Sequence, residues 1–510
     1  MKTSLYALGI SVAAGLRLAA APYTIEDILT AESPSASRSK EWKPGSGIAL
    51  EVSGMDWMAD GRLAIATRKG DVWSVDGVLD GAPDKIKFSL FASGLHEPLG
   101  VLREGGDLLV TQRTELTRLR DTDGDGVADE YRNAGHGWNV SGAYHGYAYG
   151  PRRDGQGRLW ISLNLDMGDH SDNKAPWRGW AGTIAKDGNF TPMAAGMRSP
   201  CGLGANIAGD MFCVDQQGTW VPATPIYHLR KGAFFLNPEG IASQTLPESP
   251  LKLSAKVPQK VPYPDAVHAL PEMCPPAVWL PYYKMGRSGT DLAVCDAGGK
   301  FGPFDGQLMV AEFTDAKVNR VFLEKVEGEY QGAAFPFLKG FASGIVRLLF
   351  AKDGSLMVGM TSRGWSSLGT KAYGLQRIRW NGETPFAIRE MRARHDGFEL
   401  VFTEPVDEVT ALNPASYAMK SYTYLYSSAY GSEEIEMQTL KIASIKQGSD
   451  KRSVQIVVEG LRPLYVHELR ADGVRSATSA SLEYPDAYYT LNRIPNSSGS
   501  PKPKGKNALK

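Results

Sequence analysis

The loop from Asp121 to Asp129 carries four aspartates at short spacing. It reads Asp121-Thr-Asp123-Gly-Asp125-Gly-Val-Ala-Asp129, so carboxylates alternate with residues that let the chain bend. Oxygen ligands in this arrangement suit a hard cation of the size of calcium. An EF-hand would place a glutamate at loop position 12, where this chain has Arg132. We therefore expect a different kind of calcium loop, closed by Asp129, that stabilises the fold; a solvated acidic turn is the alternative.

A histidine and two arginines stand at matching places, each beside the start of an apolar segment: His145, Arg198 and Arg347. A neutral imidazole accepts a proton from a hydroxyl group, and guanidinium groups bind carboxylates and oxyanions through paired hydrogen bonds. We expect the three side chains to face one cavity as the catalytic residues. Taken alone, His145 fits a core histidine held by a backbone carbonyl better, and the two arginines favour the catalytic interpretation.

The segment Asp215-Gln216-Gln217-Gly218-Thr219-Trp220 forms a third polar cluster. Its carboxylate and amide oxygens fit a second metal ion, with Asp215 as a ligand, and Trp220 offers a flat ring for stacking. An ordered polar loop without a ligand is the alternative. Lys317, further along the chain, is compatible with the same site, although a charge on a strand edge commonly serves only to prevent aggregation.

These candidates sit in a repeated pattern of apolar strand, Asp-Gly-type turn and second apolar strand. Six copies occur, within residues 54–66, 99–110, 147–163, 201–214, 304–310 and 346–360. Each copy alone is a hairpin with an uncovered face, and stacking neighbouring copies covers it. Six such units over about 300 residues are typical of a six-bladed β-propeller. Its innermost strands would bring His145, Arg198 and Arg347 to one mouth.

The composition changes after Thr384. From Phe386 the sequence alternates apolar and polar residues, as in 397–402 and 454–458, around a tyrosine-rich stretch from Tyr417 to Tyr430. Short alternating strands predict a small β-sandwich. The expected organisation is a signal peptide over 1–21, a propeller over 22–384, a sandwich over 385–495 and a disordered tail over 496–510, which makes the chain all-β.

Composition and charge limit the range of partners. The chain has 510 residues, and its 56 basic residues balance 56 acidic ones, so there is no electrostatic case for nucleic acid or an anionic membrane. Lys2, the apolar segment up to Leu18 and the small residues at 19–21 fit a secretory signal, and no later segment has the ~18 apolar residues of a membrane span. We expect a periplasmic or secreted protein.

The four cysteines fit an oxidising compartment. Three pairings are open, and we favour Cys201 with Cys213 and Cys274 with Cys295. The sequence contains no Cys-x-x-Cys-His, so a covalently attached c-type haem is not expected, and no Cys-x-x-Cys for a thiolate zinc site.

The chain resembles the soluble PQQ-dependent glucose and L-sorbosone dehydrogenases, in the exported form that lacks a haem domain. The likeness runs through Glu97-Pro98-Leu99-Gly100, the Asp121–Asp129 loop, Tyr144-His145, Arg198-Ser199-Pro200, Asp215-Gln216-Gln217-Gly218, 299–304 and Asn492-Arg493-Ile494-Pro495. The resemblance implies a six-bladed propeller that binds pyrroloquinoline quinone (PQQ) and calcium at its mouth.

The resemblance also implies roles for single residues. His145 would take the sugar hydroxyl proton as hydride passes to the quinone, Arg198 would face the quinone acids, and Arg347 would match one of the later cofactor arginines. Tyr144, Ser199, Gln217, Trp220 and Lys317 complete the expected cofactor contacts. The chain departs from the family where a glutamine gives way to Pro98-Leu99-Gly100, where the cofactor lysine falls near Thr314, and where one arginine falls at Ile345.

The preferred interpretation is an exported sugar or aldose dehydrogenase that passes electrons to a separate acceptor, with carbohydrate as substrate. Two alternatives keep the same mouth. One is a calcium-assisted lyase or hydrolase on acidic polysaccharide, in which arginines neutralise a uronate or sulfate and His145 or a nearby tyrosine abstracts the proton. The other is a non-catalytic propeller that binds glycan.

Overall fold

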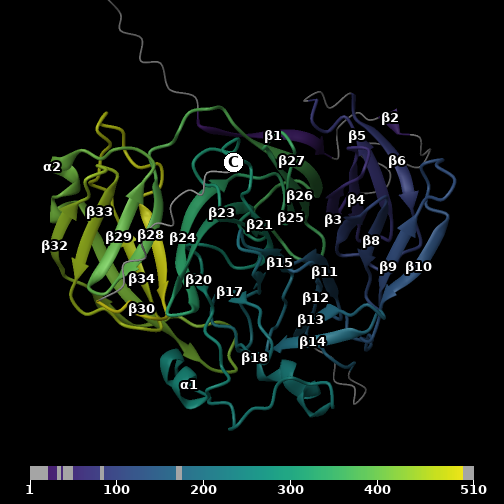
Figure 1. Ribbon diagram of the computed structural model, residues 1–510, viewed down its shortest axis with the longest axis horizontal. Helices are drawn as coiled ribbons and strands as arrows, with labels where there is room; N and C mark the ends of the chain where they lie inside the picture. The colour runs from purple at the N-terminus through teal and green to yellow at the C-terminus, as the bar shows by residue number, and fades with distance from the viewer. Residues whose placement is uncertain (1–20, 31–35, 38–49, 81–84, 168–174, 498–510) are drawn as a thin grey trace, which may run out of the picture.

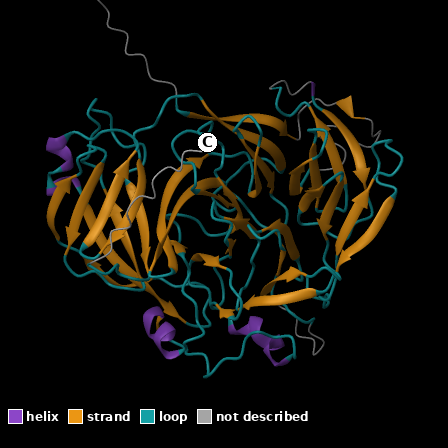
Figure 2. Ribbon diagram, viewed as in Figure 1, coloured by secondary structure: helices purple, strands orange, loops and turns teal. Residues whose placement is uncertain are grey.

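The computed structural model describes residues 21–30, 36–37, 50–80, 85–167 and 175–497. The expected signal peptide and tail lie outside these residues, apart from Ala21, Asn496 and Ser497. Strands make up nearly all of the regular structure (Figure 2). The helical elements are η2 (Pro238–Thr245), α1 (Tyr263–Ala269), α2 (Glu408–Ala411) and η3 (Pro414–Ser416). Within the described ranges, no helix has the length and apolar character of a membrane span.

Six antiparallel sheets form the blades of a propeller (Figure 1). The first three blades comprise β3 (Val52–Trp57), β4 (Leu63–Thr67), β5 (Val72–Asp76) and β6 (Lys87–Ala92); β7 (Val101–Glu104), β8 (Asp107–Thr111), β9 (Leu116–Arg120) and β10 (Glu130–Gly135); and β11 (Ala148–Arg153), β12 (Leu159–Leu163), β13 (Trp180–Ile184) and β14 (Phe190–Ala195). Short parallel strands extend two of them, β2 (Ala36–Ser37) beside β6 and β18 (Ala233–Phe234) beside β14.

The last three blades follow the same order from the inside outward. They comprise β15 (Gly202–Ala205), β16 (Met211–Val214), β17 (Thr224–His228) and β20 (Val278–Leu280); β21 (Gly289–Val294), β22 (Leu308–Glu312), β23 (Lys317–Val326) and β24 (Glu329–Lys339); and β25 (Ile345–Phe350), β26 (Leu356–Thr361), β27 (Tyr373–Trp380) and β1 (Tyr23–Thr30). Strand β1 comes from the start of the described chain and completes the last blade.

The innermost strands close into a ring. Each of β3, β7, β11, β15 and β21 contacts the next inner strand, and β25 contacts β3. Five of the sequence repeats span the inner hairpin of a blade, and the repeat at 304–310 covers the turn and β22 of the remaining blade, so the predicted propeller is confirmed. The Asp-Gly turns work as expected at Gly61 and Gly354, whose φ angles of 90° and 89° are costly for a residue with a side chain. The strands of these hairpins are buried on both faces because neighbouring blades cover them.

The C-terminal strands form the predicted sandwich. One sheet contains β28 (Ile388–Arg394), β29 (Gly397–Phe402), β33 (Ser453–Val458) and β32 (Ile442–Gln447). The facing sheet contains β30 (Ala418–Tyr426), β31 (Glu434–Thr439), β34 (Tyr465–Arg470), β35 (Asp486–Leu491) and the short β19 (Val261–Pro262). Met391, Phe398 and Ile456 of the first sheet share a buried core with Met419, Leu469 and Tyr489 of the second.

The sandwich is continuous with the propeller. Strand β35 pairs antiparallel with β24, the outer strand of the fifth blade, with Ala333 opposite Tyr489. Figure 1 shows the yellow C-terminal strands stacked beside β24 and well apart from the first blades. Because the hydrogen-bonded sheet runs through the junction, the C-terminal strands are fixed relative to the fifth blade.

The expected disulfides are absent. All four cysteines are free, and Cys201, Cys213 and Cys295 are buried. The register of the β15–β16 hairpin places Cys213 opposite Leu203, so Cys201 is not its cross-strand partner. Both predicted pairings, Cys201 with Cys213 and Cys274 with Cys295, were wrong. For the first pair the reason is that sequence spacing did not give the register of the hairpin.

Candidate functional site

A cavity of about 600 Å³ opens where the inner strands begin. Every blade contributes to its wall, through residues in or next to its innermost strand: Ser53, Leu99, Tyr149, Cys201, Thr290 and Val346. His145 and Arg198 both line this cavity. The structure therefore brings together two of the three residues expected at the mouth.

His145 is carried by a loop that precedes β11, and Arg113 holds that loop in place. The Arg113 guanidinium donates from Nη2 to the carbonyls of Ala143 (3.0 Å) and Tyr144 (2.6 Å), and from Nε to the carbonyl of Gly146 (3.2 Å). These carbonyls flank His145 on both sides along the chain. Arg113 thus restricts the backbone from which the imidazole projects.

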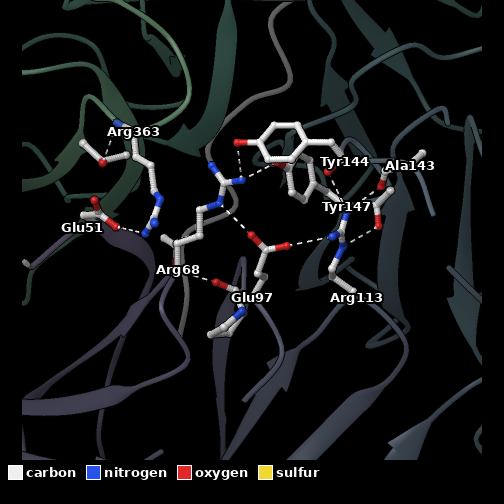
Figure 3. A network of polar contacts seen from close by, with 12 residues as sticks. Glu51, Arg68, Glu97, Arg113, Ala143, Tyr144, Tyr147 and Arg363 are labelled. Atoms are coloured by element: carbon white, nitrogen blue, oxygen red, sulfur yellow. Dashed lines mark hydrogen bonds and ion pairs between the residues drawn. The ribbon is translucent and has the colours of Figure 1, made fainter. Parts of the chain in front are cut away.

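Glu97 ties this support to the first blade (Figure 3). Its carboxylate lies 3.0 Å from Nη1 of Arg113 and 3.2 Å from Nε of Arg68. Arg68 also donates to the hydroxyls of Tyr144, at 3.0 Å, and Tyr147. The network joins residues of the first three blades across the wall of the cavity, and Tyr144 remains exposed at its rim.

The surroundings of His145 favour the neutral imidazole. Desolvation by burial is the largest cause that lowers the pKa of His145, and the charges of Arg198, Arg68 and Arg113 lower it further. A backbone hydrogen bond with Met167 acts in the opposite direction. The imidazole is therefore unprotonated at neutral pH and able to accept a proton.

Arg198 reaches the cavity across Gly218. A Cβ atom on Gly218 would lie 2.1 Å from Nε and 2.4 Å from Cζ of Arg198, so only glycine leaves room for the side chain. Asp215 fixes the backbone beneath, since its carboxylate accepts from the amides of Arg198 (2.8 Å), Ser199 (2.6 Å) and Gln216 (2.7 Å). Among the described residues, Arg198 has no ion-pair partner, and its buried Nε has no hydrogen-bond acceptor. Its guanidinium is available to an anionic ligand.

Asp215, which was predicted as a metal ligand, uses its carboxylate to accept these hydrogen bonds from backbone amides. Its side chain is fully buried, does not line the cavity, and has both oxygens engaged by backbone amides. Burial is the largest cause acting on this carboxyl, and it raises the pKa of Asp215. Asp215 thus shapes the turn that presents Arg198.

Arg347 is not among the residues that line the cavity, although its hydrogen-bond partners are. Its guanidinium donates from Nη1 to the carbonyls of Val346 (2.7 Å) and Thr290 (3.2 Å) and from Nη2 to the carbonyl of Leu99, and Nη1 lies 3.6 Å from Sγ of Cys201. These residues belong to four different blades. The side chain links the inner strands, and its neighbour Val346 faces the cavity instead.

The expected cofactor contacts are divided between the cavity and its surroundings. Tyr144, Ser199 and Gln217 line the cavity, whereas Trp220 and Lys317 do not. Trp220 packs against Tyr426 with tilted rings, whose centroids lie 5.3 Å apart. Lys317 lies 3.1 Å from a carboxylate oxygen of Asp315 and donates to the carbonyl of Lys284. Thr314, at the place of the family's cofactor lysine, lines the cavity, and its buried hydroxyl has no hydrogen-bond partner within the described part of the chain.

The acidic loop lies outside the cavity. It joins β9 to β10 in the second blade, and none of its residues lines the cavity. Oxygen atoms of Asp121, Asp123 and Asp129 lie within 4.8 Å of one another, whereas Asp125 stands outside this group. Three of the four expected carboxylates lie together. Calcium binding by this loop remains a prediction, and it concerns the stability of the fold.

Sequence reasoning missed several residues of the wall: Arg68, Arg287, Arg363 and Tyr430. Arg363 pairs with Glu51 at 2.7 Å, and Arg287 pairs with Asp315 at 3.3 Å. Tyr430 comes from the sandwich, and Arg198 Cζ lies 5.4 Å from the centre of its ring. The tyrosine-rich stretch was visible in the sequence, but the pairing that brings its end to the mouth was not.

Comparisons with known proteins give the fold a context. A family model described as a domain of unknown function (DUF7133) matches residues 55–259. No curated protein matches the chain.

Solved structures similar to the chain include three sugar dehydrogenases. The PQQ domain of a pyranose dehydrogenase from Coprinopsis cinerea has 14% identity and a TM-score of 0.46, covering 71% of this chain and 96% of that one. The PQQ-bound aldose sugar dehydrogenase from Streptomyces coelicolor has 12% identity and a TM-score of 0.45, covering 70% and 98%. The apo soluble aldose sugar dehydrogenase from Escherichia coli has 13% identity and a TM-score of 0.43, covering 70% and 100%. Similarity at this level assigns no activity, which has to be argued from the site.

Proposed function

We propose that the protein is an exported carbohydrate oxidoreductase that acts in the mouth cavity. The observation that carries the proposal is the joint position of His145 and Arg198. A neutral imidazole and a guanidinium without an acidic partner line the same cavity. This pair supplies a base for a hydroxyl proton and a cation for an anionic group within one site.

His145 acts as the general base in this proposal. Its neutral imidazole accepts the proton of the sugar hydroxyl that is oxidised, and the carbon then gives up hydride. Arg113 and Glu97 keep the loop of His145 in place during this step. The nearby guanidinium groups that keep the imidazole neutral also favour its later release of the proton to solvent.

A cofactor is required because no amino-acid side chain accepts hydride in this way. The residues of the cavity fit PQQ, a flat quinone with three carboxylates. Arg198, Arg287 and Arg68 would hold the carboxylates, and the buried, unsatisfied Nε of Arg198 is the observation that favours an anion there. When bound, PQQ supplies the two-electron acceptor.

The fit for calcium beside PQQ rests on uncharged oxygens. Ser199, Gln216 and Gln217 offer a hydroxyl and two amide carbonyls on the cavity wall. Glu51, the carboxylate on this wall, is paired with Arg363. These three uncharged side chains are therefore the ones that would accompany a cation at this place.

The test combines turnover with product analysis. Purified protein is supplied with PQQ and calcium and assayed for reduction of an artificial dye on a panel of aldoses and uronates. The proposal predicts sugar-dependent dye reduction that is lost in His145→Ala. Unsaturated products or new reducing ends from an acidic polysaccharide, without quinone binding, would replace it with a lyase or hydrolase. Export and a separate electron acceptor are part of the proposal and are tested by locating the protein and by reconstituting electron transfer.

A further inference from the structure

A turn of the C-terminal sandwich is built into the wall of the cavity. The turn of residues 427–432 follows β30, and its backbone is bonded to the loop that follows β16. Ala429 O accepts from Trp220 N (3.3 Å), Gly431 N donates to Gly218 O (3.0 Å) and Ser432 N donates to Pro222 O (3.0 Å). The turn is thus held directly beside the segment that presents Arg198.

This turn presents Tyr430 with its ring open to solvent. The side chain lines the cavity, yet 59% of the residue is exposed. Arg198 lies against the ring, with Cζ 5.4 Å from the centroid. An exposed ring held on a fixed turn beside a ligand cavity is a surface on which a flat apolar face stacks.

Two further tyrosines lie on the same part of the rim. Tyr282 lines the cavity, and its ring centroid is 4.0 Å from that of Tyr283, which is 67% exposed. Arg287 lies over the Tyr283 ring, with Cζ 4.8 Å from its centroid. Tyr282 and Tyr430 line the same cavity, as do Arg198 and Arg287. Tyrosine rings and arginine donors therefore lie together on the cavity wall.

Exposed aromatic residues are concentrated at the mouth. Among the described residues the large exposed aromatics are Tyr131, Tyr144, Tyr283, Trp365 and Tyr430. Tyr144, Trp365 and Tyr430 line the cavity, and Tyr283 adjoins it, so only Tyr131 on β10 lies elsewhere. Exposed aromatic rings that cluster at one cavity are typical of a surface that a ligand covers.

We infer that Tyr430, with Tyr282 and Tyr283, forms an outer subsite that binds the sugar ring next to the one that enters the cavity. The substrate class is then an oligosaccharide, and the C-terminal sandwich is part of the substrate site. A pyranose has one face of C–H groups that stacks on a tyrosine ring, and the exposed rings of Tyr283 and Tyr430 offer such a surface. The assignment rests on the proposed function in one respect, that the sugar in the cavity is the one oxidised.

The alternative role for Tyr430 is to position Arg198 through the contact between ring and guanidinium. The two roles differ in what the loss of the ring does. A positioning residue affects ligands of every length equally, because Arg198 acts inside the cavity. A subsite residue affects only ligands long enough to reach the rim.

The experiment is a binding titration on the full chain without cofactor. Malto-, cello- and galacturono-oligosaccharides of one to four sugars are titrated calorimetrically into wild-type protein, Tyr430→Ala, Tyr430→Phe and Tyr131→Ala, the last as a control with an exposed tyrosine outside the cavity. In at least one series, affinity is expected to rise about three- to tenfold from one sugar to two, which corresponds to one stacked ring. Tyr430→Ala should abolish this gain, and Tyr430→Phe and Tyr131→Ala should keep it.

The result that overturns the inference is either an equal loss of affinity at every length in Tyr430→Ala or the absence of a length-dependent gain in all three series. Should Tyr430→Ala lower the melting temperature, Tyr430→Leu, which keeps bulk without a flat ring, takes its place. Because binding is measured without turnover, a length-dependent gain that needs Tyr430 stands even if dye reduction fails. That combination would reject the oxidoreductase and keep the glycan subsite.

Discussion

Arg347 donates a hydrogen bond of 3.2 Å from Nη1 to the carbonyl of Thr290 in the neighbouring blade. It thereby joins the inner strands of the fifth and sixth blades at residues that line the cavity. An arginine expected to hold a ligand instead connects the strands that carry the cavity wall. Arg347 therefore shapes the cavity without facing it, whereas its neighbour Val346 faces the cavity.

Replacing Arg347 is expected to lower stability. Arg347→Met removes its hydrogen bonds to backbone carbonyls of several blades and leaves the buried Asp291 with less compensating charge. Unpaired buried acceptors and charge imbalance together cost about 3 kcal/mol. A melting curve checks this, with sugar affinity as the second readout. An unchanged melting curve together with weaker ligand binding would mean that Arg347 reaches the ligand.

The pH dependence of turnover reports His145. Burial, the largest cause, lowers the pKa of His145 below the ordinary value of 6.5, so the imidazole loses its proton at a lower pH than a free histidine. Turnover should be constant near neutral pH and fall as pH drops through a pKa below 6.5. The profile of kcat/KM measures this. An acid limb above pH 6.5 would contradict the assignment of His145 as a neutral base in this site.

Gly218→Ala is expected to weaken anion binding. The added Cβ would lie 2.1 Å from Nε of Arg198, so the guanidinium must move, while the φ angle of Gly218 is one that alanine accepts. Losing one charge-assisted contact weakens PQQ binding about tenfold or more. Quenching of protein fluorescence by PQQ measures the affinity. Gly106→Ala is the matched control, because a Cβ there meets no atom within 4 Å; an equal loss in both variants would contradict the account.

Calcium is expected to stabilise the second blade through the acidic loop. Asp121, Asp123 and Asp129 bring their oxygens within 4.8 Å of one another, which suits one cation. An ion that binds only the folded state raises the melting temperature, so chelation should lower it. Asp129→Asn should reduce this response, and Asp125→Asn, outside the group, should leave it. A melting temperature that does not respond to calcium in wild-type protein would remove the metal from the account.

Local sequence patterns predicted the propeller because each inner hairpin is encoded within a short segment. Asp-Gly turns and runs of apolar residues fix such a hairpin without reference to distant parts of the chain. The same segments predicted that His145 and Arg198 precede inner strands, which is enough to bring them to one mouth. Any residue immediately before an inner strand can be placed at the mouth in the same way.

Side-chain direction within a strand could not be predicted in the same way. Val346 and Arg347 are neighbours on β25, where the register shifts between Ile345 and Arg347. Successive side chains of a strand point to opposite faces, so one residue of register decides which of them faces the cavity. Val346 faces it, and Arg347 does not line it.

The remaining residues of the site could not be predicted because long-range pairing places them. Tyr430 reaches the mouth because the sandwich is joined to the fifth blade through β24 and β35 and because the turn after β30 bonds to the loop after β16. No local pattern encodes such a contact. Arg68 and Arg287 likewise enter the wall from loops whose direction is set by neighbouring blades.

The central claim is that, in the mouth cavity, His145 takes the proton of a sugar hydroxyl while the carbon that bears this hydroxyl is oxidised. The most direct measurement is dye reduction by the purified protein, with PQQ and calcium, on an aldose that carries deuterium at the oxidised carbon. The account predicts that deuterium slows turnover several-fold and that His145→Ala lowers it by about a hundredfold or more. Quinone that binds without any sugar-dependent dye reduction, or turnover that is unchanged in His145→Ala, would contradict it.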